Sequence, residues 1–131
     1  MAEEGTGAGV AVLVEPNLMS AVAVEGALRR AGYQVRQQPL STRPEQIAAL
    51  NPSLILVSLS VPAASAWIRG LRACPETRHL AVIGYAGHVE TDLLQAGREA
   101  GADLAAANSA VTQSLPELLA ALARRRERRA D

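Results

Sequence analysis

The sequence predicts a single α/β domain in which helices cover both faces of a parallel β-sheet. The chain has 131 residues, the usual size of one compact domain. Hydrophobic residues make up 49% and charged residues 20% of the chain, a balance that favours a folded core. Short apolar runs alternate with segments of helical periodicity, which is typical of βαβ units with right-handed crossovers. We therefore expect a three-layer αβα sandwich with a five-stranded sheet.

The first third of the chain predicts a strand, a helix and an edge strand. Residues 10–14 (VAVLV) are wholly apolar, as expected of a strand buried on both faces of a parallel sheet. Asn17 can cap a following helix, which Gly32 ends. Residues 33–37 mix polar and apolar side chains and predict a strand at the sheet edge. The helix residues expected to face the core, because they recur at helical spacing, are Leu18, Ala21, Val22 and Leu28.

The middle of the chain predicts two helices around a second apolar strand. Thr42 and Glu45 have the spacing of a capping box, which predicts a short helix through Leu50. Residues 54–59 (LILVSL) predict the second buried strand. In the helix expected after this strand, the apolar face is formed by Ala64, Trp67, Ile68 and Leu71.

The last third predicts two further strand and helix pairs. Residues 80–85 (LAVIGY) predict the third buried strand, followed by a helix over 91–100. Residues 104–107 (LAAA) predict a short last strand of mostly small residues. Ser114 and Glu117 have capping-box spacing and predict the start of a last helix. Its inward residues are expected to be Leu115, Leu118, Leu119 and Leu122.

The composition excludes several kinds of chemistry. All 13 basic residues are arginine, so Schiff-base formation and lysine-assisted phosphate sites are excluded. The single cysteine, Cys74, can form neither an internal disulfide nor a metal site by itself. Aromatic residues make up only 2% of the chain, which disfavours base-stacking platforms and aromatic flavin pockets. We expect no cofactor and no metal. No apolar run is long enough to span a membrane, so a cytoplasmic protein without membrane association is expected.

Three residue types of a hydrolase triad occur in the chain, as Ser58, Asp103 and either His79 or His88. Ser58 lacks the Gly-x-Ser-x-Gly turn that exposes a nucleophile. Asp103 comes before a predicted strand instead of after one. We therefore predict no enzymatic activity.

The end of the chain is strongly basic. Residues 124–131 hold five arginines against Glu127 and Asp131, so this segment carries a net charge of three positive and the rest of the chain three negative. Cations at the carboxyl end of a helix stabilise its dipole, and we favour this role. The same charge could also serve nucleic acid, an acidic partner or a subunit interface.

The carboxyl ends of the strands are where open parallel sheets bind ligands. The residues predicted to lie there are Glu15, Pro16, Ser58, Leu59, Tyr85, Ala86, Asn108 and Ser109.

Four segments of the chain share the order and spacing of motifs in a known family. They are residues 12–16 (VLVEP), 28–35 (LRRAGYQV), 51–62 (NPSLILVSLSVP) and 99–103 (EAGAD). Together they resemble the receiver domain of bacterial response regulators, over nearly all of residues 10–122. The resemblance implies a flavodoxin-like sheet with strand order 2-1-3-4-5. We therefore divide the chain into a flexible leader (1–9), a receiver-like domain (10–123) and an arginine-rich helix end (124–131).

The resemblance also implies a phosphorylation site, and most of its positions depart from the family pattern. The resemblance places the acidic pair on Glu15 and Pro16, and the phospho-accepting Asp on Ser58. It places the switch Thr or Ser on Tyr85, the aromatic switch residue on Ala105 and the lysine on Asn108. A lone Glu15 offers too little negative charge for magnesium. A serine cannot form the acyl phosphate that the family uses. We therefore expect a degenerate, pseudo-receiver pocket.

The resemblance implies a role in two-component, phosphorelay signal transduction. We expect a stand-alone receiver-like protein that acts through a bacterial protein partner, independently of phosphorylation. In similar proteins the partner and homodimer face combines the fourth helix, the fifth strand and the last helix, which here carry Leu104, Ala105, Ala106, Leu115 and Leu119. Two alternatives remain open. One is a small-molecule sensor that uses the vacated crevice near Glu15, Ser58 and Asn108, and the other is a nucleic-acid accessory bound through the C-terminal arginines.

Overall fold

Strands and helices alternate along the chain, with one extra helix near the end. The computed structural model describes residues 7–130, so Asp131 and residues 1–6 of the predicted leader lie outside the described part. The strands are β1 (Gly9–Val14), β2 (Tyr33–Gln37), β3 (Leu54–Ser58), β4 (Val82–Ala86) and β5 (Leu104–Ala107). The helices are α1 (Leu18–Arg30), α2 (Pro44–Ala49), α3 (Ala64–Ala73), α4 (Thr91–Ala100), α5 (Asn108–Gln113) and α6 (Leu115–Ala130).

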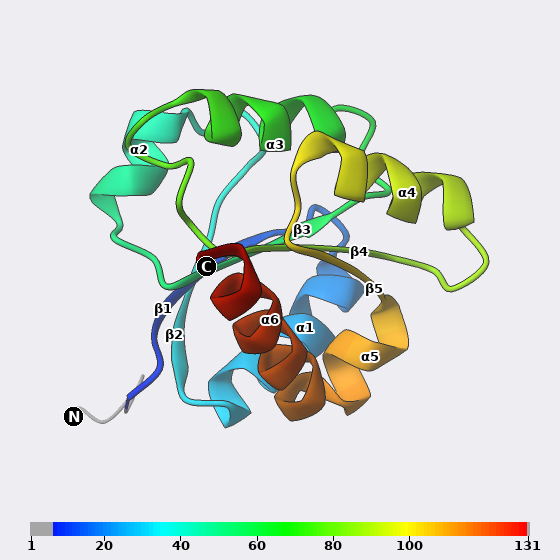
Figure 1. Ribbon diagram of the computed structural model, residues 1–131. Coiled ribbons are helices and arrows are strands. Elements are labelled where there is room, and N and C mark those ends of the chain that lie inside the picture. The colour runs from blue at the N-terminus through cyan, green and yellow to red at the C-terminus, as the bar shows by residue number, and fades with distance from the viewer. Residues whose placement is uncertain (1–6, 131) are drawn as a thin grey trace.

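The five strands form one parallel sheet in the order β2-β1-β3-β4-β5. Helices α2, α3 and α4 lie on one face of the sheet, and α1, α5 and α6 lie on the other (Figure 1). The predicted three-layer sandwich and its strand order are therefore confirmed. As in other parallel sheets, all strands end at the same edge, which we call the carboxyl edge. The opposite edge, where the strands begin, is the amino edge.

Alternation along the strands divides the core into two clusters, one on each face. In β1, Val12 packs toward α2, α3 and α4, whereas Leu13 packs toward α1, α5 and α6. The side chain of Leu59 fits between two glycines: a Cβ atom added to Gly97 would lie 2.7 Å from it, and one added to Gly84 would lie 2.8 Å from it. Helix α4 can therefore approach the sheet closely only because these two positions lack side chains.

The inward face of α1 differs from the prediction. Leu18 and Val22 are 78% and 67% exposed, so they do not face the core. The buried residues of the helix are Ala21, Val24, Ala27 and Leu28. Because α1 carries two neighbouring apolar stripes, periodicity alone could not decide which one packs against the sheet.

Helix α5 was not predicted. The chain passes from β5 directly into this helix, so Asn108 and Ser109 are exposed helical residues instead of loop residues at the crevice. Val111 is the one buried residue of α5. At Ser114 the chain turns into α6, whose first turn closes with a hydrogen bond from Leu118 N to Ser114 O at 3.1 Å. Helix α6 then continues without a break to Ala130.

Three element starts can be compared with the sequence prediction: the start of α1 agrees with it, and the starts of α2 and β4 differ. Asn17 caps α1 as expected, because its Oδ1 accepts from Ser20 N at 3.0 Å. The predicted capping box of α2 is wrong: the N-cap is Arg43, and its amide donates to Gln46 Oε1 at 2.9 Å. Strand β4 begins at Val82 instead of residue 80, because the carbonyl of Leu80 accepts a hydrogen bond from the Arg72 guanidinium instead of from a neighbouring strand.

Candidate functional site

Three residues predicted from the sequence lie side by side at the carboxyl edge. Glu15 follows Val14, which is paired with Val57, and the next residue of β3, Ser58, is paired with Tyr85 of β4. Side chains at such matched positions point to the same face of a parallel sheet. Glu15, Ser58 and Tyr85 therefore form one row across β1, β3 and β4, on the face covered by α1, α5 and α6.

A hydrogen bond joins the two ends of this row. The Tyr85 hydroxyl donates to Glu15 Oε1 at 2.6 Å. Two strand spacings of about 4.8 Å separate these residues, and Ser58 lies between them. The tyrosine side chain must therefore pass over Ser58, which is possible because the serine side chain is small. Tyr85 is 2% exposed and Ser58 is 5% exposed, so little of this position reaches solvent.

Both carboxylate oxygens of Glu15 are engaged by donors of the chain itself. Oε1 accepts from the Tyr85 hydroxyl, and Oε2 accepts from Asn17 N at 3.0 Å. Magnesium requires carboxylate oxygens that are free to enter its coordination shell. The single acidic residue of the row is therefore used to hold Tyr85 and to shape the turn into α1.

The surroundings of Tyr85 keep its hydroxyl protonated. Burial raises the pKa of Tyr85 well above its ordinary value, and the hydrogen bond to Glu15 and the negative charge of that residue raise the pKa further. A protonated hydroxyl remains a donor, so the bond to Glu15 persists at neutral pH.

The other predicted pocket positions do not join this row. Pro16 is exposed. Asn108 is exposed at the start of α5, where its carbonyl accepts from Thr112 Oγ1 at 3.2 Å. Ala105 is half-buried, is paired with Gly84, and packs against the cluster beneath α3 and α4. Of the six predicted pocket positions, the structure thus brings only Glu15, Ser58 and Tyr85 together.

The residues expected to form a partner surface differ in exposure. Leu104, Ala105 and Ala106 are half-exposed on β5, an edge strand of the sheet. Leu115 is 3% exposed and belongs to the core, so it cannot contribute to a surface. Leu119 is half-buried against the same cluster. The large apolar side chains that do lie on the surface were not predicted to do so: they are Leu18, Met19 and Val22 of α1, and Val89.

A hollow of about 240 Å³ lies beside Glu15 at the carboxyl edge. It is formed by residues from three neighbouring connections and is largely apolar; the lining residues are Val14, Glu15, Pro16, Gln38, Pro39, Leu40 and Val61. Ser58 and Asn108, the other residues expected at a vacated crevice, are not among them.

The residues of the nominal hydrolase triad lie at opposite edges of the sheet. Ser58 ends β3 at the carboxyl edge, whereas Asp103 and His79 precede β5 and β4 at the amino edge. His88 is exposed in the connection before α4. These residues therefore do not assemble into a triad.

The arginines at the end of the chain are only partly free. Arg126 Nη1 donates to Asp103 Oδ2 at 3.0 Å, and Arg129 forms a second ion pair with the same carboxylate. Arg126 and Arg129 thus bind a carboxylate of the chain itself, whereas Arg124, Arg125 and Arg128 are exposed. Sequence reasoning missed this cluster because its members are far apart in the chain.

Within residues 7–130, no three or more His, Cys, Asp or Glu side chains gather where they could hold a metal ion. None of the helices in the same range has both the length and the apolar character needed to cross a lipid bilayer.

Comparison with known proteins gives matches at the level of structure. No protein-family model matches the sequence, and no curated protein matches it. A response regulator of Chloroflexus aurantiacus superposes with a TM-score of 0.69 at 23% identity, covering 85% of this chain and 97% of its own. One from Thermotoga maritima gives 0.67 at 20% identity, covering 87% and 96%.

A third similar structure is the receiver domain of a sensor histidine kinase from Pseudomonas aeruginosa, described with a magnesium ion coordinated in its active-site cleft. It superposes with a TM-score of 0.65 at 20% identity, and the match covers 90% of this chain and 97% of that domain. These matches agree with the strand order and the helix layers found above. The chain has the fold of response-regulator receiver domains.

Proposed function

We propose that this protein is a receiver-like component of two-component signal transduction that works through protein contacts and without aspartyl phosphorylation. The observation that carries the proposal is the hydrogen bond from Tyr85 to Glu15 across Ser58. It places a buried aromatic side chain in the row where the resemblance puts the phospho-acceptor. No catalytic role and no cofactor form part of the proposal.

Phosphoryl transfer in this family uses a nucleophile, a free carboxylate and a positive charge, and this chain is deficient in all three. The acceptor position holds a serine, whose hydroxyl is a poor substitute for a carboxylate nucleophile. The one nearby carboxylate already accepts hydrogen bonds from Tyr85 and Asn17. The chain has no lysine to neutralise the phosphoryl oxygens, and Asn108 is uncharged. Since phosphoryl transfer depends almost entirely on positioning and charge stabilisation, these changes together oppose the reaction.

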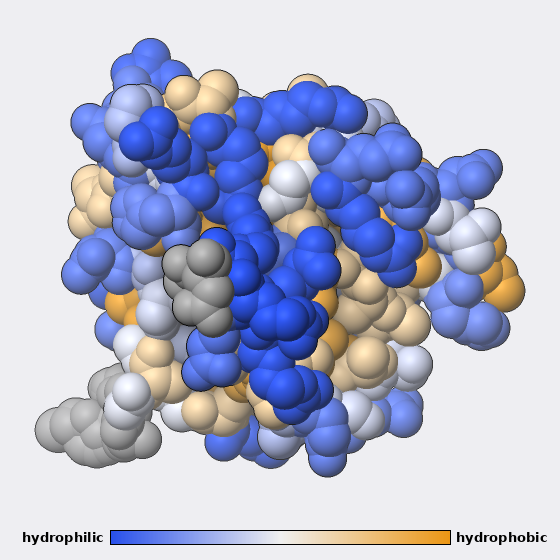
Figure 2. Space-filling view, viewed as in Figure 1, coloured by the Kyte–Doolittle hydropathy of each residue, from blue (hydrophilic) through white to orange (hydrophobic). Residues whose placement is uncertain are grey.

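The surface around β5 supports a role in protein contacts. Figure 2 shows a pale orange, mildly hydrophobic area over β5 and α5, beside the hydrophilic blue surface of α6. Ala105 and Ala106 leave the outer side of an edge strand accessible, and small side chains allow another chain to approach closely. A second copy of this chain is our first candidate for the partner.

Phosphate analogues test the pocket directly. With magnesium and either acetyl phosphate or beryllofluoride, we expect no phosphoryl adduct by mass and no change in the amide signals of Glu15, Ser58 and Tyr85. A receiver domain with a complete acidic pocket serves as the positive control under the same conditions. A matched variant, Ser58→Asp with Tyr85→Thr, frees Glu15 and adds a second carboxylate, so magnesium-dependent amide shifts should appear. A magnesium-dependent response or a labile adduct on Ser58 in the unaltered protein would contradict the proposal.

Light scattering after gel filtration tests the partner face. We expect a concentration-dependent dimer that Ser109→Arg weakens, because Ser109 is exposed directly beyond β5. Ser41→Arg is the matched control, since Ser41 is also exposed but precedes α2 on the other side of the sheet. A protein that stays monomeric at high concentration would exclude the second copy as partner and leave the pocket result unaffected.

The hollow beside Glu15 favours a second candidate function, the sensing of a small apolar molecule. Its volume of about 240 Å³ is slightly below the usual range of ligand pockets, and its lining is largely apolar. Val61→Trp should fill the hollow and abolish binding of any compound found by ligand-observed NMR. A compound whose binding this variant leaves unchanged would not be using the hollow.

A further inference from the structure

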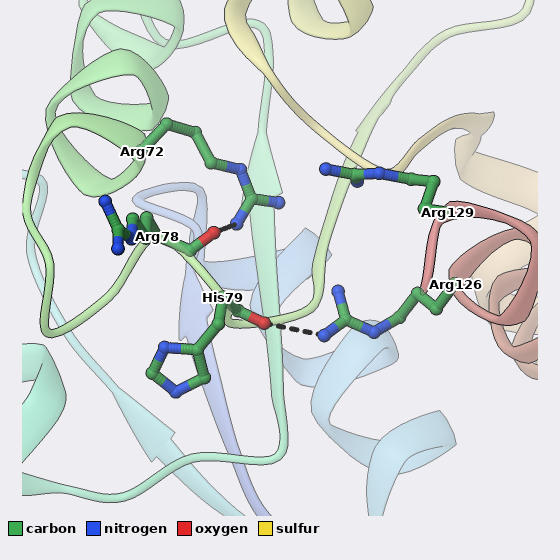
Figure 3. Close-up of a pocket in the computed structure, with 5 residues that line it drawn as sticks. All are labelled: Arg72, Arg78, His79, Arg126 and Arg129. Carbon is green, nitrogen blue, oxygen red and sulfur yellow. Dashed lines mark hydrogen bonds between the residues drawn. The ribbon is translucent and has the colours of Figure 1, made fainter. Parts of the chain in front are cut away.

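The amino edge of the sheet holds a second cavity, on the side of the molecule opposite Glu15. Its volume is about 310 Å³, and its lining residues are Arg72, Arg78, His79, Arg126 and Arg129. Figure 3 shows the guanidinium groups of Arg72, Arg126 and Arg129 approaching one space from α3 and α6. The side chains of Arg78 and His79 point away from that space, whereas their backbone carbonyls face it and accept from Arg72 and Arg126 (Figure 3). Three cationic side chains therefore converge at this cavity, and the exposed Arg78 lies at its rim.

A buried carboxylate holds this arrangement together. The Asp103 side chain is fully buried, and its Oδ2 accepts from Val82 N at 2.9 Å. It forms ion pairs with Arg72 at 3.1 Å, with Arg126 at 3.0 Å and with Arg129. Arg126 also donates to His79 O at 2.6 Å. The end of α6 is thus fixed against the amino edge, with its arginines turned toward the cavity.

The positive charge of the cavity exceeds what the chain neutralises. Among the described residues, Asp103 is the one carboxylate in ion pairs with these arginines, so three guanidinium groups share a single negative charge. Burial lowers the pKa of Arg72, and although Asp103 opposes this effect, the charges of Arg129 and Arg126 lower that pKa further. The cations therefore repel one another, and a second anion would relieve the repulsion.

The donors that remain for a ligand belong to particular residues. Arg72 uses four of its five N–H donors, because Nε donates to Gly101 O at 2.8 Å, Nη1 donates to the carbonyls of Arg78 and Leu80, each at 2.7 Å, and Nη2 donates to Asp103. The Arg129 side chain is 55% exposed and uses one Nη for Asp103. Arg78 is exposed, and within residues 7–130 its guanidinium group has no hydrogen bond or ion pair. The Arg78 side chain points away from the other three, however (Figure 3). Since each guanidinium carries five N–H donors, Arg129 has four left for a ligand and Arg126 has three.

We propose that this cavity binds a phosphate-bearing small molecule, whose phosphoryl oxygens are held by Arg129 and Arg126 in the field of Arg72. Planar guanidinium groups bind phosphate through paired hydrogen bonds, and a multiply charged anion gains most from the excess positive charge. The cavity volume is at the lower end of the range for small-molecule sites and exceeds the volume of one phosphate group. Convergence of cations on one hollow favours a compact ligand over a nucleic-acid strand.

Pyrophosphate and inorganic phosphate are the probes for the test, added to the full chain at constant ionic strength with chloride as the balancing anion. We expect a saturable rise in Tm of several degrees with pyrophosphate and a smaller rise with phosphate. Saturation matters because phosphate also stabilises proteins non-specifically by exclusion from their surfaces. The amide signals of residues 78–82 and 102–104 should shift with the same dissociation constant.

Charge-matched variants on one helix provide the control. Arg129→Gln should weaken pyrophosphate binding about tenfold or more, since a charge-assisted hydrogen bond contributes about that factor. Arg128→Gln and Arg125→Gln remove equal charge from exposed positions of α6 and should change the affinity less than about twofold. If Arg129→Gln lowers stability, Arg129→Lys gives the same information, because a lysine keeps the positive charge beside Asp103 but cannot form the paired hydrogen bonds of a guanidinium with phosphate.

Three results would overturn the proposal. One is a rise in Tm that does not saturate. Another is equal weakening by Arg128→Gln and Arg129→Gln. The third is duplex DNA that competes with pyrophosphate and loses affinity equally in Arg125→Gln, which would assign the charge to a nucleic-acid surface along α6.

Discussion

The hydrogen bond between Tyr85 and Glu15 can be tested by removing one oxygen atom. Tyr85→Phe keeps the buried ring in the core and deletes the hydroxyl that donates to Glu15 at 2.6 Å. A hydrogen bond to a charged group contributes about 1.5–3 kcal/mol to stability. Glu15 is half-exposed, and its other oxygen keeps the bond from Asn17, so water can replace part of the loss. We therefore expect the free energy of unfolding to fall by about 1.5 kcal/mol, at the lower end of that range.

Thermal and chemical unfolding can measure this change. For a chain of 131 residues, an unfolding entropy of about 2.1 cal/mol/K per residue converts 1.5 kcal/mol into a decrease in Tm of about 5 °C. Urea unfolding followed by circular dichroism should show a lower midpoint with an unchanged slope. Tyr33→Phe is the matched control, because Tyr33 is half-exposed and should lose less than about 0.5 kcal/mol.

A double-mutant cycle identifies the pair responsible. Glu15→Gln and Tyr85→Phe should each destabilise the protein, and the double variant should lose less than the sum, with a coupling energy of about 1 kcal/mol. Tyr85→Phe with unchanged stability, or additive losses in the double variant, would refute the account of the site given above.

Three further predictions concern alkaline pH, the buried carboxylate and close packing. Burial and Glu15 raise the folded-state pKa of Tyr85, so this contribution to stability is complete below the unfolded pKa of about 10 and is lost as pH rises above it, by at most about 1.4 kcal/mol per pH unit. In Tyr33→Phe, phenolate absorbance should therefore appear only as the protein unfolds, and a full native-state titration step near pH 10 would exclude a buried Tyr85. Asp103→Asn should lower the free energy of unfolding by about 2–4 kcal/mol, because three arginines lose their shared counter-charge while an acceptor for Val82 N remains. A loss below about 1 kcal/mol in urea unfolding would mean that the arginine cluster around Asp103 is not formed in solution. Gly97→Ala should destabilise by about 1–2 kcal/mol, since its Cβ would lie 2.7 Å from the Leu59 side chain, whereas Gly70→Ala, with nothing within 4 Å, should stabilise by about 0.5–1 kcal/mol; equal effects in thermal unfolding would contradict the packing of α4.

The secondary structure could be predicted from the sequence wherever a local residue pattern is compatible with only one type of element and one buried face. Apolar runs such as 54–59 are compatible with burial on both faces and little else, so the parallel sheet followed from them. The buried face of α1 could not be predicted in this way, because Leu18 and Val22 make a second apolar stripe beside the one that is buried. Helix α5 could not be predicted either, since Val111 alone gives no periodicity.

Part of the candidate site was also within reach of the sequence. Given the strand order, Glu15, Ser58 and Tyr85 hold matched positions in neighbouring strands, so their shared row could have been predicted from register. The hydrogen bond itself could not be predicted, because it joins residues 70 positions apart and depends on the side-chain rotamer of Tyr85.

The amino acid order by itself determined the layered architecture and the absence of lysine, because both depend on residue types that are visible one segment at a time. Tertiary structure alone decided that Tyr85 reaches across Ser58 to Glu15 and that arginines from α3 and α6 meet at Asp103. Long polar side chains can choose among several partners, and only the packing of distant segments brings one acceptor within reach and excludes the water that would otherwise replace it.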